Sequence, residues 1–513
     1  MKKISLIILI IFSAINLLFS QNVKDSLVLF TDLKYHSEFE KNALYNFVKQ
    51  KRDTFNLFLA IDENMTSEEA IGHYNTYIKV FDEMNQEKIA SKKIQKQIKI
   101  AYSSVHSRFL KKYNSNEFYP VMFRVGTYNC VSASMLYSLV FDKLKIPYKV
   151  MASSNHVYLI ANPGENSVVV ETTNPGFEKS IFNGEFKQQY VDYLRDSKLI
   201  SNDDYKNKSI EEIFEEKFNE VKNAEFWNLP GFQYYNKAVS KMQNNEIETA
   251  YELCQKAYFF YPDQQVKTVL YTALLILIEK SNFDKVSDID YLAQFSRFEN
   301  SDLNLIIGIF NNIIGHYLQY TDKDQYCDSL FKRLTSQITN KVIKEEVSFS
   351  YFMQMSYRYQ NTNKAEYYVN NALKIKGNHH DANVILTNYI QNKLNDIDDS
   401  YSKIDTIKQF EKKYNYEQIL PMLKEQEMIV YLRIAADSYN HNQIKTGDKY
   451  LELFENNCKL PIENRLLNFL IESTYHTIAV YHYNKHDKIK AKNIVDKGLK
   501  YIPDSKLIKA AIY

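Results

Sequence analysis

The chain has 513 residues, which suggests roughly two to four domains at about 150 residues per domain. Hydrophobic residues make up 45% and charged residues 25%, a globular balance that excludes wholesale disorder. Only 11 glycines and 9 prolines are present, which disfavours collagen-like chains and turn-dense all-β folds. The 64 Lys and Arg residues balance 62 Asp and Glu residues, so no basic field exists to gather nucleic acid.

The first 20 residues are typical of a secretory signal peptide. Lys2 and Lys3 precede an apolar run from Ile4 to Phe19, and the small residue Ser20 precedes a polar stretch. The apolar run is shorter than the about 20 residues that a membrane-spanning helix needs, although an uncleaved anchor remains the alternative. We therefore expect a periplasmic or secreted protein with no integral membrane span after signal removal.

Residues 24 to about 115 have apolar side chains at helical spacing, as in Ile94, Ile98, Ala101 and Val105. The stretch from 119 to 175 differs, because it holds β-rich runs and the densest turn signals. Helical spacing resumes at Ser209 and continues to the end of the chain. The sequence thus predicts a short β-containing segment between two helical regions.

Cys130 is predicted to begin a helix. Gly126 permits a tight turn before it, and Pro147 ends the helix. A cysteine in the first turn lies near the positive end of the helix dipole, which favours the reactive thiolate. The apolar face of this helix holds Leu136, Leu139, Val140 and Leu144.

Three strands are predicted after this helix, over residues 148–152, 156–161 and 167–173. A turn at 163–166 would join the last two as a hairpin, with Asn162 opposite Ser167. His156 and Glu171 then lie diagonally on one face, about 7–8 Å apart, within reach of a long side chain. We expect Glu171 to orient the His156 imidazole.

A thiol at a helix start, an imidazole on a strand and a carboxylate on the next strand suit a nucleophile, a base and an orienting acid. This order resembles the transglutaminase-like family of papain-type cysteine enzymes, over residues 90 to about 185. The residues that carry the resemblance are Asn129-Cys130, Asn155-His156-Val157 and the run from Glu171 to Pro175.

The resemblance implies acyl chemistry with Cys130, His156 and Glu171 as a catalytic triad. Tyr128, Asn129 and Asn155 are weaker candidates for oxyanion or positioning roles. Two departures stand out: Glu171 replaces the usual Asp, and Val131 replaces an aromatic residue that follows the nucleophile in many members. No cofactor or metal is implied. His379-His380-Asp381 is interpreted as a helix cap, and the other cysteines as core residues.

The C-terminal half contains a repeated pattern. Four central small residues each follow a large aromatic residue at a fixed distance, and further small residues recur at fixed distances before and after them. This spacing is expected where paired helices cross. This pattern resembles degenerate tetratricopeptide repeats, with a generic helical bundle as the alternative. The central small residues are Ala250, Ala365, Gly447 and Ala491, and the aromatic residues that precede them are Tyr234, Phe349, Tyr431 and Tyr475.

The expected fold class is an α+β transglutaminase-like core with a helical N-terminal lead-in, followed by an all-α tetratricopeptide-like solenoid. The expected function is an exported thiol-dependent acyl hydrolase or acyl transferase acting on amide or peptide bonds, with a protein or peptide partner along the repeat groove. The alternative is a catalytically inactive scaffold whose repeats bind proteins. The expected domains are a signal peptide at 1–20, the lead-in and core at 21–208, a linker helix at 209–230 and repeats at 231–513.

Overall fold

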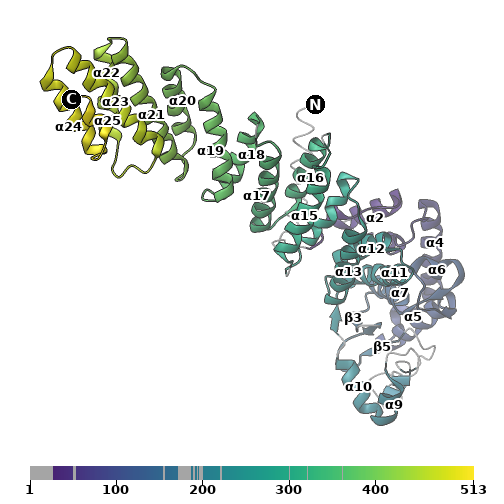
Figure 1. Ribbon diagram of the computed structural model, residues 1–513. Coiled ribbons are helices and arrows are strands. Elements are labelled where there is room, and N and C mark those ends of the chain that lie inside the picture. Colours follow the sequence, from purple (N-terminus) through teal and green to yellow (C-terminus); the bar gives the residue numbers. More distant parts are fainter. Residues whose placement is uncertain are drawn as a thin grey trace. The chain divides into compact units, whose positions relative to one another are not determined.

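The computed structural model describes most of the chain that follows the predicted signal peptide (Figure 1). Residues 1–20 and the predicted positioning residue Asn155 lie outside the described residues. The chain divides into two compact units, Met1–Asn300 and Ser301–Tyr513. The described residues are 27–49, 53–153, 156–171, 187–188, 191–192, 195, 200–219, 222–299, 301–320, 322–360 and 362–512.

The predicted fold class, with its α+β transglutaminase-like core, is wrong, because the protein is mostly all-α. The structure is 72% helical and 4% strand over the residues that it describes. The β-rich runs do form strands, but the longest of these hold five residues each. The rest of the chain is poor in Gly and Pro, so helix-forming residues dominate the fold.

The first helices of the N-terminal unit begin at side-chain caps. Ser37, Asp53 and Thr66 each accept a hydrogen bond from a backbone N–H of the first turn, which would otherwise lack a partner. These helices are α2 (Glu38–Val48), α3 (Thr54–Leu59) and α4 (Ser67–Gln86), which follow the 3₁₀ turn η1 (Phe30–Asp32) and precede η2 (Ile89–Ser91) and α5 (Ile94–Phe109).

A tight turn leads into the helix that carries Cys130. Helix α6 (Tyr119–Val125) ends at Gly126, whose φ of 79° is the left-handed conformation that glycine adopts without strain. Strand β2 (Thr127–Tyr128) follows and pairs in parallel with β1 (Lys112–Tyr113). Helix α7 (Cys130–Leu144) then begins at the cysteine, where the sequence predicts it to begin.

The larger sheet is antiparallel and has the strand order β5-β4-β3-β6. Ala161 pairs with Val168, which is the register expected for Asn162 opposite Ser167. Strand β6 returns from more than fifty residues later in the chain and pairs with β3. The strands are β3 (Tyr148–Ala152), β4 (Val157–Ala161), β5 (Val168–Val170) and β6 (Lys222–Ala224).

Helix α7 is the centre of the N-terminal core, since every residue from Cys130 to Phe141 is buried. Its Ser134 hydroxyl donates to the carbonyl of Val157 on β4 at 3.3 Å, and Tyr77 of α4 donates to the carbonyl of Leu139 at 3.0 Å. Packing on several sides explains why α7 lacks a polar face. The helix and strand that carry Cys130 and His156 are therefore held together by core packing.

The helices after the sheet fold back onto this core. The Gln233 side chain of α11 accepts from the N–H of Tyr119 at 2.7 Å and donates to the carbonyl of Phe58 at 3.1 Å. These residues are buried, so the bonds satisfy polar groups inside the core. The elements are α9 (Asn202–Asn207), α10 (Ile210–Asn219), η3 (Phe226–Asn228), α11 (Leu229–Gln243), α12 (Ile247–Phe260), α13 (Gln264–Lys280), η4 (Val286–Asp288) and α14 (Ile289–Phe295).

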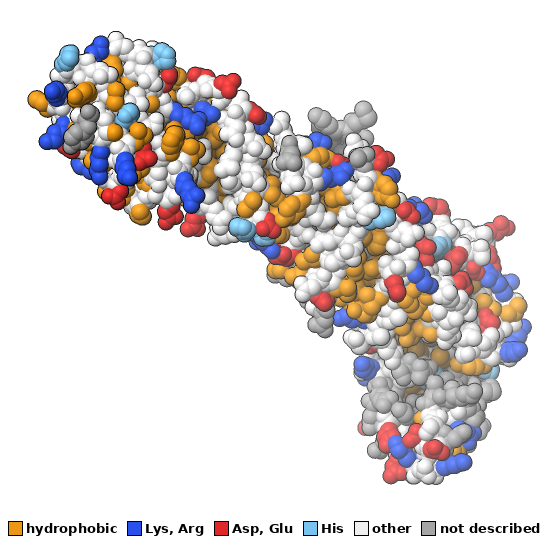
Figure 2. Space-filling model, in the orientation of Figure 1, with side chains coloured by type: hydrophobic (Ala, Val, Ile, Leu, Met, Phe, Trp, Pro, Cys, Tyr) orange, Lys and Arg blue, Asp and Glu red, His pale blue; other side chains and the backbone are white. Residues whose placement is uncertain are grey.

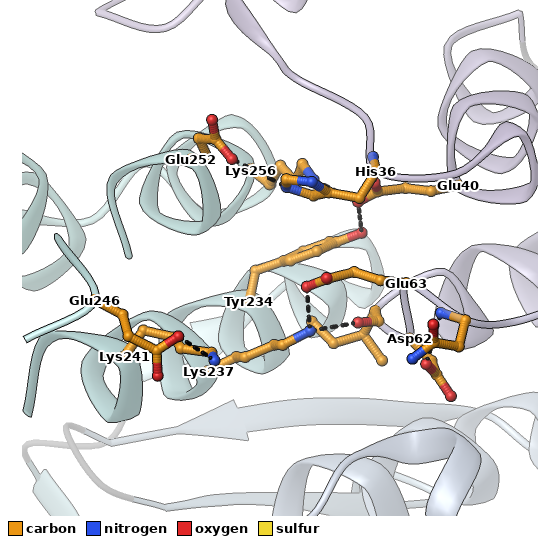
Figure 3. Close-up of polar contacts among 12 residues, drawn as sticks. His36, Glu40, Asp62, Glu63, Tyr234, Lys237, Lys241, Glu246, Glu252 and Lys256 are labelled. Atoms are coloured by element: carbon orange, nitrogen blue, oxygen red, sulfur yellow. Dashed lines mark hydrogen bonds and ion pairs between the residues drawn. The ribbon is translucent and has the colours of Figure 1, made fainter. Parts of the chain in front are cut away.

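A buried ion pair ties the start of the N-terminal unit to α12 (Figure 3). Lys256 is fully buried, and its ammonium donates to Glu40 Oε1 of α2 at 2.5 Å. The hydroxyl of Tyr234 donates to the same carboxylate oxygen at 3.3 Å, and the His36 backbone N–H donates to Glu40 Oε2 at 2.8 Å. Burial nevertheless lowers the pKa of Lys256, although Glu40 opposes that shift.

The C-terminal unit consists of helices over its described residues. Consecutive helices pack as pairs, α17 with α18, α21 with α22 and α23 with α24, and each pair contains one of the predicted small residues at 365, 447 and 491. The helices are α15 (Leu303–Tyr317), α16 (Asp324–Gln337), α17 (Lys341–Arg358), α18 (Asn363–Ile375), α19 (His380–Asn395), α20 (Ser400–Lys413), α21 (Ile419–Asn440), α22 (Ile444–Asn457), α23 (Arg465–Asn484), α24 (Lys488–Tyr501) and α25 (Lys506–Ala510).

Gly447 illustrates the close approach within such a pair. A Cβ atom at this position of α22 would lie 2.5 Å from a ring carbon of Tyr439 on α21.

On the face drawn in Figure 2, Lys and Arg side chains are interspersed with Asp and Glu side chains. Within the described residues, no helix has both the length and the apolar character that crossing a bilayer requires.

Candidate active site

Asn129 fixes the start of the helix that carries Cys130. Its side-chain oxygen accepts from the Ser132 N–H at 2.8 Å, and the Ser132 hydroxyl accepts from the Asn129 N–H at 2.9 Å. This reciprocal capping box makes Cys130 the first residue of α7. The thiol is thus placed in the first helical turn, close to the positive end of the helix dipole.

The amide of Asn129 also holds the preceding loop. Its Nδ2 donates to the carbonyl of Ser115 at 3.2 Å and to the carbonyl of Glu117 at 2.6 Å. These two bonds use both amide hydrogens, which suits a positioning role and leaves no donor for an oxyanion.

His156 and Glu171 are in direct contact. Nε2 of His156 lies 2.8 Å from Oε2 of Glu171, a distance typical of a charge-assisted hydrogen bond. His156 is 1% exposed, whereas the Glu171 side chain is 20% exposed. The hairpin register explains the contact, because it places the two residues diagonally on one face of the sheet.

The Cys130 thiol is the second partner of the imidazole. Burial disfavours the charged ring, but the Glu171 carboxylate and the Cys130 thiol together outweigh burial and raise the pKa of His156 to about 10. Cys130 itself is 6% exposed. The structure therefore brings together Cys130, His156 and Glu171, with the imidazole as the group on which both the thiol and the carboxylate act.

Tyrosine rings surround the triad. The Tyr158 ring stacks on the His156 ring with centroids 5.7 Å apart. Tyr128, two residues before Cys130, is buried, and burial together with the Glu171 carboxylate raises the pKa of its hydroxyl. Tyr128 therefore lies near the carboxylate end of the site, which gives no direct support to a role as an oxyanion donor.

Tyr102 of α5 was not among the predicted site residues. Its hydroxyl donates to the backbone oxygen of Glu171 at 3.4 Å. The sequence contains a weak signal for a buried Tyr102, because this residue follows Ala101 on the apolar helix face that Ile98 and Val105 define. A tyrosine on a buried helix face requires a partner for its hydroxyl.

The other three cysteines have different surroundings. Burial raises the pKa of Cys254 to about 12, and burial also raises the pKa values of Cys327 and Cys458, each to about 11. All four thiols are free. A raised pKa suppresses the nucleophilic thiolate, so Cys254 is a core residue, as expected from the sequence.

His379 caps a helix, as the sequence indicates. It is the N-cap of α19, where its Nδ1 accepts from the Ala382 N–H at 3.4 Å. Among the described residues, no group of three or more His, Cys, Asp or Glu side chains is arranged to hold a metal ion.

Comparison with known proteins assigns no family to this chain. No family model matches it. No curated protein matches it either.

Proposed function

We propose that the protein is an exported thiol-dependent acyl hydrolase or acyl transferase that acts on amide or peptide bonds. The observation that carries the proposal is the buried His156 ring, whose Nε2 lies 2.8 Å from Glu171 Oε2 and whose pKa is raised by Glu171 and also by Cys130. A buried imidazole that joins a thiol to a carboxylate is the arrangement that nucleophilic cysteine catalysis requires. The resemblance to transglutaminase-like enzymes supports the proposal only through this local arrangement, since the fold class differs.

The first half-reaction forms a thioester. The Cys130 sulfur attacks the carbonyl carbon, and the C–S bond forms as the carbonyl π electrons move to oxygen. Collapse of the tetrahedral intermediate breaks the C–N bond, and the amine leaves with the proton held by His156. The Cys130 backbone N–H lies in the first helical turn, where N–H groups have no intrahelical partner, and it is the proposed oxyanion donor.

The second half-reaction releases the acyl group. Water or an amine attacks the thioester carbonyl while His156 takes its proton, and the C–S bond breaks to return Cys130 as a thiolate beside the imidazolium. Glu171 stabilises the positive charge on the ring in both halves. Hydrolysis and transfer differ only in the acceptor, so the triad is compatible with both.

The alternative proposal is an inactive core with a protein-binding helical half. The paired helices of the C-terminal unit favour it, because exposed helix pairs offer surfaces for a protein or peptide partner. It requires no reactive thiol. The chemical state of Cys130 therefore separates the two proposals.

Alkylation of Cys130 tests the enzyme proposal. The rate of iodoacetamide modification is measured for each cysteine by peptide mass spectrometry at pH 7, with glutathione as the reference thiol. We expect Cys130 to react at least about tenfold faster than glutathione, because an ion pair maintains the thiolate. His156→Ala abolishes the excess rate if the proposal holds. A rate no higher than that of glutathione, in a chain that circular dichroism shows to be folded, favours the inactive scaffold.

A further inference from the structure

Tyr102 is held rigidly beside the triad. Its ring is stacked between His106, with centroids 5.6 Å apart and planes 8° apart, and Tyr137, at 5.5 Å and 7°. The Tyr137 hydroxyl also donates to the backbone oxygen of Tyr102 at 3.3 Å. The side chain is buried, so neither ring rotation nor solvent exposure is available to it without disrupting the stack.

The fixed hydroxyl of Tyr102 meets the main chain at Glu171. The two residues are 69 positions apart, and the hydroxyl donates to the Glu171 backbone oxygen at 3.4 Å. Strand β5 ends at Val170, which pairs with Leu159, so Glu171 lies one residue beyond the end of that strand. At the point where strand pairing stops, Tyr102 provides a hydrogen bond that constrains the backbone of the acid.

The position of the acid matters because a carboxylate–imidazolium interaction depends steeply on distance and alignment. Glu171 Oε2 lies 2.8 Å from His156 Nε2. If the Glu171 backbone moves, the side chain samples longer distances, and the imidazolium loses stabilisation. The proton then returns from His156 to the Cys130 sulfur, and the reactive thiolate is depleted.

We infer that Tyr102 is a positioning residue for the acyl chemistry: its hydroxyl anchors the backbone of Glu171 so that the carboxylate meets the ring of His156. The effect of Tyr102 on the chemistry of Cys130 rests on the proposed function, whereas the anchoring of the Glu171 backbone does not depend on it. Tyr102 acts through Glu171 and does not touch the reacting atoms. Its role differs from that of Tyr158, which contacts the imidazole ring directly.

The test uses the full chain with Tyr102→Phe, which keeps the ring stack and removes the hydroxyl. A single hydrogen bond of about 1 kcal/mol corresponds to a loss of roughly threefold to tenfold in the rate of Cys130 alkylation at pH 7. The loss should disappear above about pH 9, where thiols ionise without help from an imidazolium. This recovery at high pH is not expected from a general structural defect.

Tyr77→Phe is the matched control. It removes a buried hydroxyl that likewise donates to a main-chain carbonyl of the core, that of Leu139 at 3.0 Å, outside the stack that Tyr102 forms with His106 and Tyr137. We expect its alkylation rate to equal that of the unmodified chain at every pH. Equal rates for Tyr102→Phe and the unmodified chain at pH 7, or an equal deficit across the pH range, overturn the inference.

A second measurement separates this inference from the proposed function. The His156 ring is titrated by NMR with ¹³Cε1-labelled histidine in the Cys130→Ala chain, with and without Tyr102→Phe. A lower imidazole pKa with Tyr102→Phe supports the positioning role, even if Cys130 of the unmodified chain proves unreactive and the enzyme proposal fails. An unchanged titration overturns the positioning role and leaves the enzyme proposal untouched.

Discussion

His156 and Glu171 join a buried ring to a partly exposed acid: Nε2 of His156, a residue that is 1% exposed, lies 2.8 Å from Oε2 of Glu171, whose side chain is 20% exposed. The Cys130 thiol also acts on the ring, because it contributes to the raised pKa of His156. Because the Glu171 carboxylate favours the charged form of the ring, the acid influences the chemistry of Cys130 through His156.

Glu171→Gln tests this dependence. The substitution keeps the shape of the side chain but removes the charge that stabilises the imidazolium, so the pKa of His156 should fall. Hydrogen bonds to charged groups contribute about 1.5–3 kcal/mol, which corresponds to roughly a tenfold to hundredfold loss in Cys130 alkylation at pH 7. Glu165→Gln, in the exposed turn after β4, is the control and should retain the full rate. An unaffected rate in Glu171→Gln would contradict the triad.

The stability of the protein should also depend on this contact through pH. The pKa of His156 is raised to about 10 in the folded chain, against 6.5 for an ordinary imidazole. Its contribution to stability is therefore complete below pH 6.5 and is lost as the pH rises through 10. The slope is at most about 1.4 kcal/mol per pH unit.

Thermal unfolding between pH 6.5 and pH 9.5 measures this slope. The midpoint should fall more steeply for the unmodified chain than for His156→Gln, which cannot titrate in this range. For each chain, the change of the midpoint with pH is measured relative to its own value at pH 6.5. A general loss of stability from the substitution therefore does not affect the comparison of slopes. Parallel slopes would show that His156 is not protonated in the folded chain.

Local helix and turn boundaries were predicted better from the sequence than the fold class was. Gly126, Cys130 and Pro147 mark helix and turn boundaries by their backbone preferences, and those local rules place the start of α7 correctly. The register of the β4–β5 hairpin likewise follows from a turn of a few residues. The fold class depends instead on how much of the chain joins a sheet, and short β-rich runs do not reveal that amount.

Tyr102 shows why part of the site was missed. Its contact with Glu171 spans 69 positions, and the local pattern near Tyr102 indicates only a buried tyrosine whose hydroxyl needs a partner, not which residue is that partner. The pairing of β6 with β3 is similar, since residues 222–224 carry no β-rich pattern and pair only because the chain returns to the sheet. Such contacts follow from tertiary packing, which overrides local preference.

Asn129→Ala should weaken both the helix and the site. Loss of an N-cap side chain lowers the free energy of unfolding by about 1 kcal/mol, and the bonds to Ser115 and Glu117 are lost as well. We expect slower Cys130 alkylation because the first turn of α7 frays. Asn129→Asp is the informative comparison: it retains the cap acceptor but not the amide donors, so it should keep the helix start while releasing the loop. Equal stability of all three chains in urea would argue against the cap.

The buried pair of Glu40 and Lys256 predicts a large effect on stability. Lys256→Met leaves the Glu40 carboxylate buried without its cation, which lowers the free energy of unfolding by about 3–5 kcal/mol. The double variant Glu40→Gln with Lys256→Met should recover part of this loss. Lys41→Met, which removes a partner from the exposed pair with Glu38, should change stability by no more than about 0.5 kcal/mol. Urea unfolding measures the free energy of unfolding of the unmodified chain, the two single variants and the double variant. A loss of less than about 1 kcal/mol in Lys256→Met would exclude a strong buried pair.

Gly447→Ala tests the close approach of α21 and α22. The new Cβ would lie 2.5 Å from a ring carbon of Tyr439 and 3.3 Å from the backbone oxygen of Ala435, so the helices must separate. Overpacking of this kind costs about 1–3 kcal/mol.

Gly308→Ala is the matched control, because Gly308 lies inside α15 with no atom within 4 Å of an added Cβ. That change should stabilise the chain by up to about 1 kcal/mol through helix propensity. Opposite shifts in the urea midpoint are therefore expected from the same chemical change, and shifts of the same sign would show that helix propensity, not the contact with Tyr439, governs position 447.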